Sequence, residues 1–302
     1  MIYAAALAPA PHVVLLAGDE EYRSEEMMPQ LARILEKNGF RCTVLLSQNA
    51  KGEIDPEATN NLPGLKALET ADLCIMLLRF RSWPDEDMAH FVRYWESKKP
   101  IIALRTSTHA FRYAGNSTSK YRKFSFDSRE WPGGFGKQVL GETWVSHWGN
   151  HGSQGTRTHA VASHAMLTGV GSIFVTTDVY EAHPPATAQV LLRGEVVDGM
   201  TATAPAATGL KGTALGTEQL LNSPMMPVLW VQDQIVTTTL GAGVDLLDPS
   251  LRRLLVNAAF WTTTGSVPST VNADLVGPYE PSPFGFGRFR RGIRASRASN
   301  VD

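Results

Sequence analysis

Residues 73–104 read LCIMLLRFRSWPDEDMAHFVRYWESKKPIIAL and contain one complete strand-helix-strand unit. The unit begins and ends with short apolar runs, 73–78 and 101–104, which are typical of fully buried strands. Between them, Pro84 and three acidic residues suit the first turn of a helix, and apolar side chains then recur at helical spacing. Apolar strands joined by one amphipathic helix predict parallel strands in a sheet that is covered on both faces.

The same alternation continues on both sides of this unit. Upstream, we expect a strand at 12–17, a helix at about 24–38, a strand at 40–46 and a short helix at 65–70. Downstream the periodicity is weaker, and the expected strands are 143–146, 157–162, 188–193, 227–231 and 235–239. A last helix is expected to begin at its cap Asp248 and to end near Gly265. The sequence therefore predicts one α/β domain with a flavodoxin-like, doubly wound, mostly parallel sheet.

The predicted domain spans residues 12–265 and leaves a segment at each end. Residues 1–11 include Ala6-Leu7-Ala8, which has the small-x-small form of a signal-peptidase site, but no basic region precedes it and the apolar core is short. The segment is interpreted as a possible leader remnant, so the protein is cytoplasmic as the sequence stands and periplasmic or exported if a longer leader exists. Residues 266–302 are rich in Pro, Gly and Arg and are expected to lie over the domain as a tail.

Composition excludes several partner classes. The chain has 302 residues, 43% of them hydrophobic, and a formal net charge of -1, which gives no field that would attract nucleic acid or an anionic membrane. No apolar run approaches the roughly 20 residues of a membrane-spanning helix. The tail interleaves aromatic and arginine residues at 284–294, but packing on the domain explains this pattern better than RNA binding. We expect a small-molecule ligand, no nucleic acid, no membrane span and a possible homo-oligomer.

Polar side chains follow three of the predicted strands directly. In an open α/β sheet, ligands bind outside the carboxyl ends of the strands, where the strand order reverses. If the order is 2-1-3-4, the turns that carry Asp19 and Glu20, Arg79, and Arg105 and His109 lie side by side. Two interpretations remain open: a satisfied ion-pair network at the rim of the sheet, or a cleft in which Arg79 or Arg105 grips an oxygen-rich small molecule.

A second group of polar and aromatic residues lies in the loop 142–157. His147 and His151 have the four-residue spacing of helical zinc ligands, but Gly149 and Gly152 argue against a helix there. Zinc binding by His147 and His151 therefore stays a less favoured alternative to histidines that bond to backbone or ligand. The cofactor is otherwise unknown. The loop also contains residues that suit a sugar ring, through stacking or hydrogen bonds: Trp144, Trp148 and Asn150.

The turn after strand 101–104 lacks a nucleophile. It reads Arg105-Thr106-Ser107-Thr108-His109, where a hydrolase or amidotransferase of this layout would have Gly-x-Cys-x-Gly or Gly-x-Ser-x-Gly. A buried arginine at this position needs an acidic partner, and Asp19, Glu20 and Glu142 are the candidates. Its remaining donors are expected to face the crevice.

Several motifs together resemble those of the ThuA-like (trehalose utilisation) family, especially its larger, often exported bacterial subgroup. The motifs are AGDEEYRSEE at 17–26, ALRTSTHAF at 103–111, VLGETWVSH at 139–147, TTLGA at 238–242 and RRLLVNAAFW at 252–261. The resemblance covers nearly the whole chain and implies the class I glutamine amidotransferase-like fold. It also implies that Arg105 occupies the place of the Cys nucleophile, where many relatives have His, and that Ala242 stands where relatives often read Gly-His. The catalytic triad is then degenerate.

The resemblance implies a role in disaccharide or keto-sugar catabolism without glutamine amidotransferase activity. The candidate catalytic residues are His109, His147 and Glu20, because imidazole titrates near neutrality and can exchange protons. The candidate substrate-binding residues are Asp19, Arg79, Arg105, Trp144, Trp148 and Asn150. Two alternatives remain: a catalytically silent sugar-binding or partner-binding module, and a metal-dependent hydrolase, lyase or isomerase that uses His147 and His151. Whether the chain is an enzyme is left open by these alternatives.

Overall fold

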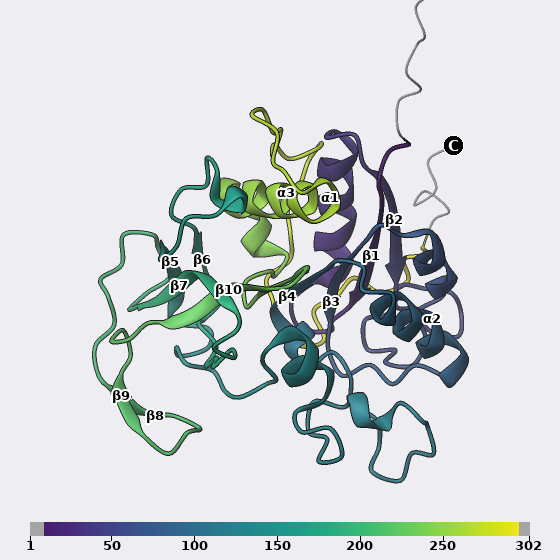
Figure 1. Ribbon diagram of the computed structural model, residues 1–302, viewed down its shortest axis with the longest axis horizontal. Helices are drawn as coiled ribbons and strands as arrows, with labels where there is room; N and C mark the ends of the chain where they lie inside the picture. The colour runs from purple at the N-terminus through teal and green to yellow at the C-terminus, as the bar shows by residue number, and fades with distance from the viewer. Residues whose placement is uncertain (1–8, 296–302) are drawn as a thin grey trace, which may run out of the picture.

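The sheet joins a parallel half to an antiparallel half in the computed structural model, which describes residues 9–295 (Figure 1). Within these residues, nine strands form one sheet in the order β2-β1-β3-β4-β11-β10-β7-β5-β6. Strands β2 to β11 of this order run parallel, and the strands beyond β11 pair antiparallel. The predicted flavodoxin-like α/β fold and the order of its first four strands are confirmed.

The elements have the following bounds. The strands of the large sheet are β1 (His12–Gly18), β2 (Arg41–Leu46), β3 (Leu73–Leu78), β4 (Ile101–Leu104), β5 (Gly155–Ala160), β6 (Phe174–Val175), β7 (Gln189–Val197), β10 (Met226–Gln232) and β11 (Ile235–Thr238). A separate hairpin consists of β8 (Leu210–Gly212) and β9 (Glu218–Leu220). The α-helices are α1 (Ser24–Glu36), α2 (Asp85–Glu96) and α3 (Pro249–Thr264), and the short helical turns used below are η1 (Leu65–Thr70) and η2 (Arg105–His109).

The two faces of the parallel strands have different covers, because successive residues of a strand point to opposite sides. Val13 and Leu15 of β1 belong to the core that contains the inner sides of α1 and α3. Val14 and Leu16 belong to the core that contains η1 and α2. Figure 1 shows α1 and α3 together on one side of the sheet and α2 on the other. Burial on both faces explains why β1 and β3 are continuous apolar runs.

The last helix has the predicted ends. Asp248 caps α3, since its Oδ1 accepts a hydrogen bond of 2.9 Å from the backbone N–H of Leu251, and Pro249 occupies the first turn. Gly265 ends the helix in the left-handed conformation, with φ of 76°. The other carboxylate oxygen of Asp248 accepts from the N–H of Phe174, so the cap also fixes β6.

Several boundaries in the second half differ from those expected. Residues 143–146 do not form a strand, and the isolated bridge in this loop joins the next residue, His147, to Tyr180. Strand β5 begins at Gly155, and β7 extends to Val197. The short strands β6, β8 and β9 were not expected, since two or three residues carry too little alternation to be recognised.

The described part of the tail contacts the domain near β1. The N–H of Gly285 donates to the carbonyl oxygen of Glu21 at 2.7 Å, and the Arg23 guanidinium donates to the carbonyl oxygen of Gly285 at 2.7 Å. The ring of Phe284 lies 5.6 Å from that of Tyr22. Of the possible leader remnant, residues 1–8 lie outside the described residues. Among the helices of residues 9–295, none is long and apolar enough to cross a membrane.

Replacement of Asp248 by Ala should lower the free energy of unfolding by about 1–2 kcal/mol, because an N-cap is lost. Asp248→Asn keeps one acceptor oxygen and should cost clearly less. Urea denaturation of the two variants measures the difference. If Asp248→Ala is as stable as Asp248→Asn, the cap does not hold α3 as described.

Candidate functional site

A cavity of about 390 Å³ opens at the carboxyl ends of the parallel strands. Its walls come from the turns after β1, β3 and β4, from the loop after residue 141, from the segment before β7 and from the tail. The polar lining residues are Glu21, Arg79, His109, His147 and His151, and the aromatic ones are Phe80, Trp144, Tyr180 and Phe286, with Gly285 beside them. The three turns that were expected to converge all contribute to this cavity. The loop 142–157, called the histidine loop below, contributes to it as well.

Arg105 lies beneath this cavity and not in its wall. Its side chain is completely buried, and its backbone has the left-handed φ of 39° at the sharp turn from β4 into η2. One nitrogen, Nη1, donates to the carbonyl oxygens of Asp178 and Thr239 at 3.1 and 2.9 Å. The other, Nη2, donates to Oδ1 of Asp178 at 2.9 Å and to the Tyr22 hydroxyl at 3.1 Å. Because both terminal nitrogens of Arg105 already donate hydrogen bonds within the protein, they are not available to bind a ligand in a bidentate manner.

The acidic partner of Arg105 is therefore Asp178, and none of the expected candidates Asp19, Glu20 and Glu142 takes this role. Glu142 pairs instead with Lys137 at 2.9 Å. Asp178 lies on the irregular segment between β6 and β7, where no motif marks it. The only available signal was an acidic residue between short apolar stretches. The expectation that the remaining Arg105 donors face the crevice is wrong, because its terminal nitrogens donate to backbone carbonyls, Asp178 and Tyr22, and its Nε is buried without a partner among the described residues.

Both members of this buried pair are charged. Burial opposes the charged form of Arg105, but Tyr180, Tyr22 and Asp178 raise its pKa well above the usual value. The guanidinium carbon lies 4.2 Å from the ring centres of Tyr22 and Tyr180, so the cation sits between two aromatic faces. Burial also opposes ionisation of Asp178, yet hydrogen bonds from His147 and His151 and the charge of Arg105 keep its pKa below the usual range.

Asp178 orients two histidines at the cavity wall. An ionised carboxylate only accepts hydrogen bonds, so the Nδ1 atoms of both rings must be the donors. His147 donates to Oδ2 at 2.8 Å, and His151 donates to Oδ1 at 3.0 Å. Neutral His147 then has Nε2 as a free proton acceptor, and no hydrogen bond within the described residues engages this atom. A carboxylate that fixes the tautomer of a histidine is the arrangement found in acid-base catalysis.

His151 continues this chain of contacts to Glu21. Its Nε2 lies 3.4 Å from Oε1 of Glu21, and its ring lies 4.7 Å from that of His147. Burial, followed by the charge of Asp19, raises the pKa of Glu21. This contact places the Glu21 carboxyl group next to the two histidines in the cavity wall.

His109 reaches the cavity but is almost completely buried. Its pKa lies well below the usual value, first because of burial and then because of the charges of Arg79 and Arg105. Its ring packs 5.0 Å from Trp144 and 5.2 Å from Phe80. A histidine that stays neutral among aromatic rings is a poor proton donor at neutral pH. Of the two histidine candidates for proton transfer, the geometry favours His147.

The two acidic candidates in the turn after β1 have structural partners. The Asp19 carboxylate accepts hydrogen bonds from the N–H groups of Glu21 and Tyr22 at 2.7 and 2.5 Å and from the Thr106 hydroxyl. Glu20 pairs with Arg79 through one oxygen and with Arg81 through the other at 2.9 Å. Neither Asp19 nor Glu20 lines the cavity. Their expected roles are corrected, and Glu21, which was not singled out, is the acidic residue in the wall.

Of the aromatic and amide candidates in the histidine loop, only one lines the cavity. Trp144 lines the cavity, with its ring 4.7 Å from that of Tyr180. Trp148 is buried in the hydrophobic core, and its indole N–H donates to the carbonyl oxygen of Leu221 at 2.8 Å. Asn150 is exposed outside the cavity, and its backbone N–H donates to the Gln154 side chain. Trp148 and Asn150 therefore do not reach a ligand in this cavity.

Two histidines of the histidine loop and the nearby Asp178 form a group that could hold a metal ion. Ligand atoms of His147, His151 and Asp178 all lie within 4.8 Å of one another. Two imidazoles and a carboxylate are a common donor set for zinc and other transition metals. The charge of Arg105 opposes a cation here, because Nη2 of its guanidinium already contacts the Asp178 carboxylate.

Comparisons with known proteins relate the chain to others by fold. No protein-family model and no curated protein match the sequence. A ThuA-like protein of Bacteroides uniformis superposes with a TM-score of 0.53 at 16% identity, covering 88% of this chain and 98% of its own. A ThuA-like protein of Parabacteroides merdae gives 0.52 at 15% identity, covering 87% and 93%. A glutamine amidotransferase of Thermotoga maritima gives 0.42 at 11% identity, covering 84% and 98%. The chain shares the fold of the two ThuA-like proteins over most of its length.

Proposed function

We propose that this chain is a ThuA-like protein of carbohydrate catabolism that binds a disaccharide or keto-sugar in the cavity at the strand ends. The observation that carries the proposal is the pairing of an aromatic wall with a histidine oriented by a buried carboxylate. Trp144 offers an aromatic ring to the apolar side of a sugar, and Phe80 and Phe286, whose rings lie against the Arg79 guanidinium, border the same cavity. His147 offers a nitrogen for proton transfer, and Arg79 offers donors for hydroxyl or carbonyl oxygens.

The proposal includes the absence of glutamine amidotransferase activity. That chemistry needs a nucleophile at the turn after β4 and a histidine to activate it. Arg105 occupies the turn and points into the core toward Asp178. Ala242, at the position where the resemblance implies a histidine in relatives, is buried and has no ionisable group. In this proposal, the groups that transfer protons belong to the histidine loop.

His147→Gln should lower turnover of a keto-disaccharide at least about 100-fold, since a positioned acid-base group contributes on this order. The fold should be unaffected because the ring lies at the cavity wall. The control is His159→Gln, since His159 also pairs with an acidic residue, Glu195, but lies outside the cavity. Product analysis by chromatography and binding by calorimetry measure the two effects. Tight binding without turnover by the unchanged protein would favour the silent sugar-binding module.

The clustering of His147, His151 and Asp178 favours a metal-dependent hydrolase, lyase or isomerase as a second candidate. Protein purified without chelator and dialysed against zinc should then retain about one ion per chain. His151→Gln should abolish retention, because it removes one ligand. Retention by the variant, or no metal in the unchanged protein by elemental analysis, would contradict this candidate while leaving metal-free proton transfer intact.

Arg105→Met should lower the free energy of unfolding by about 3–5 kcal/mol, because it leaves the buried Asp178 without its cation. The double variant Arg105→Met/Asp178→Asn removes both charges and should recover a large part of this loss. Turnover should stay low in the double variant, since His147 loses its carboxylate. Urea denaturation and activity assays check the two effects. A double variant no more stable than Arg105→Met would show that the ion pair is not the basis of the effect.

A further inference from the structure

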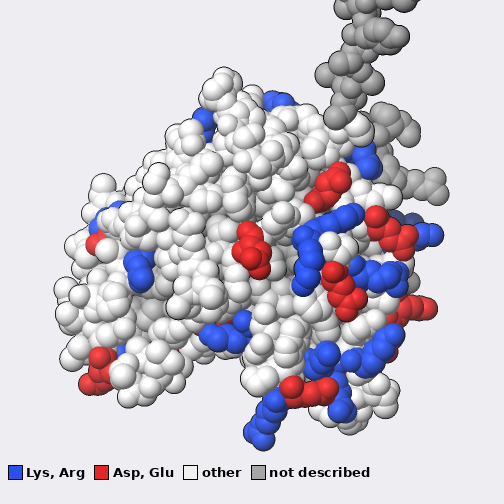
Figure 2. Space-filling view, viewed as in Figure 1, with Lys and Arg blue, Asp and Glu red and all other residues white. Residues whose placement is uncertain are grey.

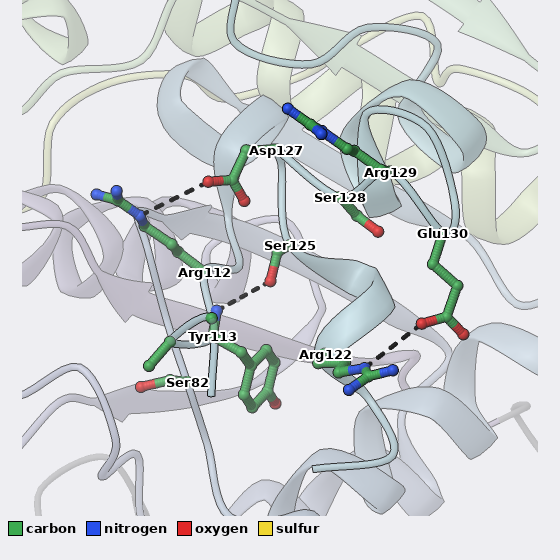
Figure 3. A pocket seen from close by; sticks show the side chains of 11 residues that line it. Ser82, Arg112, Tyr113, Arg122, Ser125, Asp127, Ser128, Arg129 and Glu130 are labelled. Atoms are coloured by element: carbon green, nitrogen blue, oxygen red, sulfur yellow. Dashed lines mark hydrogen bonds and ion pairs between the residues drawn. The ribbon is translucent and has the colours of Figure 1, made fainter. Parts of the chain in front are cut away.

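A second, larger cavity of about 800 Å³ opens beside the segment 112–130 and shares no residue with the wall of the strand-end cavity. We call it the arginine pocket, after Arg112, Arg122 and Arg129 in its wall. Figure 3 shows the Arg112 and Arg122 side chains on opposite sides of Ser125, with Ser128 next to Arg129. The pocket lies outside the site that the proposed function uses.

The segment that borders the pocket carries a net positive charge, although Asp127 and Glu130 also lie in the wall. Residues 112–131 contain five Lys or Arg and two Asp or Glu, a net charge of +3, in a chain whose formal net charge is -1. In Figure 2, Lys and Arg side chains gather on the half of the face that holds α2 and the loops below the sheet, with Asp and Glu side chains among them, whereas the opposite half has few charges. A local excess of positive charge in a concave site concentrates anions.

The guanidinium groups of the pocket are only weakly engaged. Arg112 and Arg122 pair with Asp127 and Glu130 at 4.0 and 3.5 Å, and more than half of each of these side chains is exposed. Exposed pairs of this kind contribute little, about 0–1 kcal/mol. No hydrogen bond or ion pair within residues 9–295 engages the Arg129 side chain. These donors are therefore available to a ligand, in contrast to those of Arg105.

The remaining lining indicates the size and the polarity of the ligand. Hydroxyl groups of Ser82, Ser125 and Ser128 border the pocket together with Tyr113. A volume of about 800 Å³ accommodates a molecule of disaccharide size. Guanidinium forks match the oxygen pairs of carboxylates and phosphates, and hydroxyl groups match a polyhydroxylated body.

We infer that the arginine pocket is a separate binding site for a small carbohydrate that bears an oxyanion. Guanidinium groups of the wall hold the anionic group, and the serine hydroxyls contact the sugar body. The oxyanion belongs to either a sugar phosphate or a uronic acid, since both present the same geometry to a guanidinium. This inference is independent of the reaction proposed for the strand-end cavity.

Calorimetric titration with glucose 6-phosphate, digalacturonate and neutral trehalose tests the inference. One of the two anions should bind at micromolar to millimolar concentration. The double variant Arg112→Gln/Arg129→Gln should weaken that binding by about tenfold or more, because two charge-assisted contacts are lost. If glucose 6-phosphate binds, the anionic group is a phosphate, and if digalacturonate binds, it is a carboxylate.

The matched control is Arg93→Gln, which removes an arginine of similar exposure on α2 that pairs weakly with Glu69 at 3.5 Å. It should leave anion binding unchanged, as should Trp144→Ala in the strand-end cavity. The inference is overturned if neither anion binds, or if Arg93→Gln weakens binding as much as the double variant. It is also overturned if Trp144→Ala, and not the arginine variant, abolishes anion binding. Trehalose binding that depends on Trp144 reports on the proposed function separately.

Discussion

The buried ion pair of Arg105 and Asp178 is the constraint on which the rest of the site depends. Arg105 follows β4, in the parallel half of the sheet, and Asp178 precedes β7, in the antiparallel half. The same guanidinium reaches Thr239 at the end of β11 and Tyr22 in the turn after β1. One cation thus joins four segments that are distant in sequence. Two buried charges are costly unless they are paired and hydrogen-bonded, so these segments have little freedom to separate.

This pair also accounts for the role of the turn after β4. The backbone at Arg105 is left-handed, and the side chain is directed into the core toward Asp178. The candidate chemistry lies instead on the histidine loop, whose position depends on the same carboxylate. Asp178 accepts from Arg105 on its buried side and from His147 and His151 on the side of the cavity. A single carboxylate therefore links the fold to the candidate site.

The sequence predicted the elements whose signals are local. The apolar runs of β1 and β3, the periodicity of α2 and the cap of α3 depend on neighbours within one element, and the structure confirms them. The placement of Trp148 was wrong because its burial depends on strands far away in sequence. Asp178 and Tyr180 were missed because they lie on an irregular segment without periodicity. Their roles arise only when the sheet brings that segment to Arg105.

For the turns after β1 and β3, the charged residues divide between an ion-pair network and the wall of the cavity. Glu20 with Arg79 and Arg81 forms the ion-pair network at the rim, whereas Glu21 and Arg79 line the cavity. Arg79 takes part in both. No feature of the sequence distinguishes Glu20 from Glu21, since adjacent residues in a turn point in different directions that only the backbone path decides.

Phe80 has a left-handed backbone, with φ of 54°, which costs a residue with a side chain roughly 1–2 kcal/mol relative to glycine. The guanidinium carbons of Arg79 and Arg112 lie 4.4 and 5.4 Å from the centre of its ring. Arg79 borders the strand-end cavity and Arg112 borders the arginine pocket, so this one residue contacts the walls of both cavities. Glycine would relax the backbone at this position but would remove both contacts. The strained conformation is thus the cost of holding one ring against two arginines.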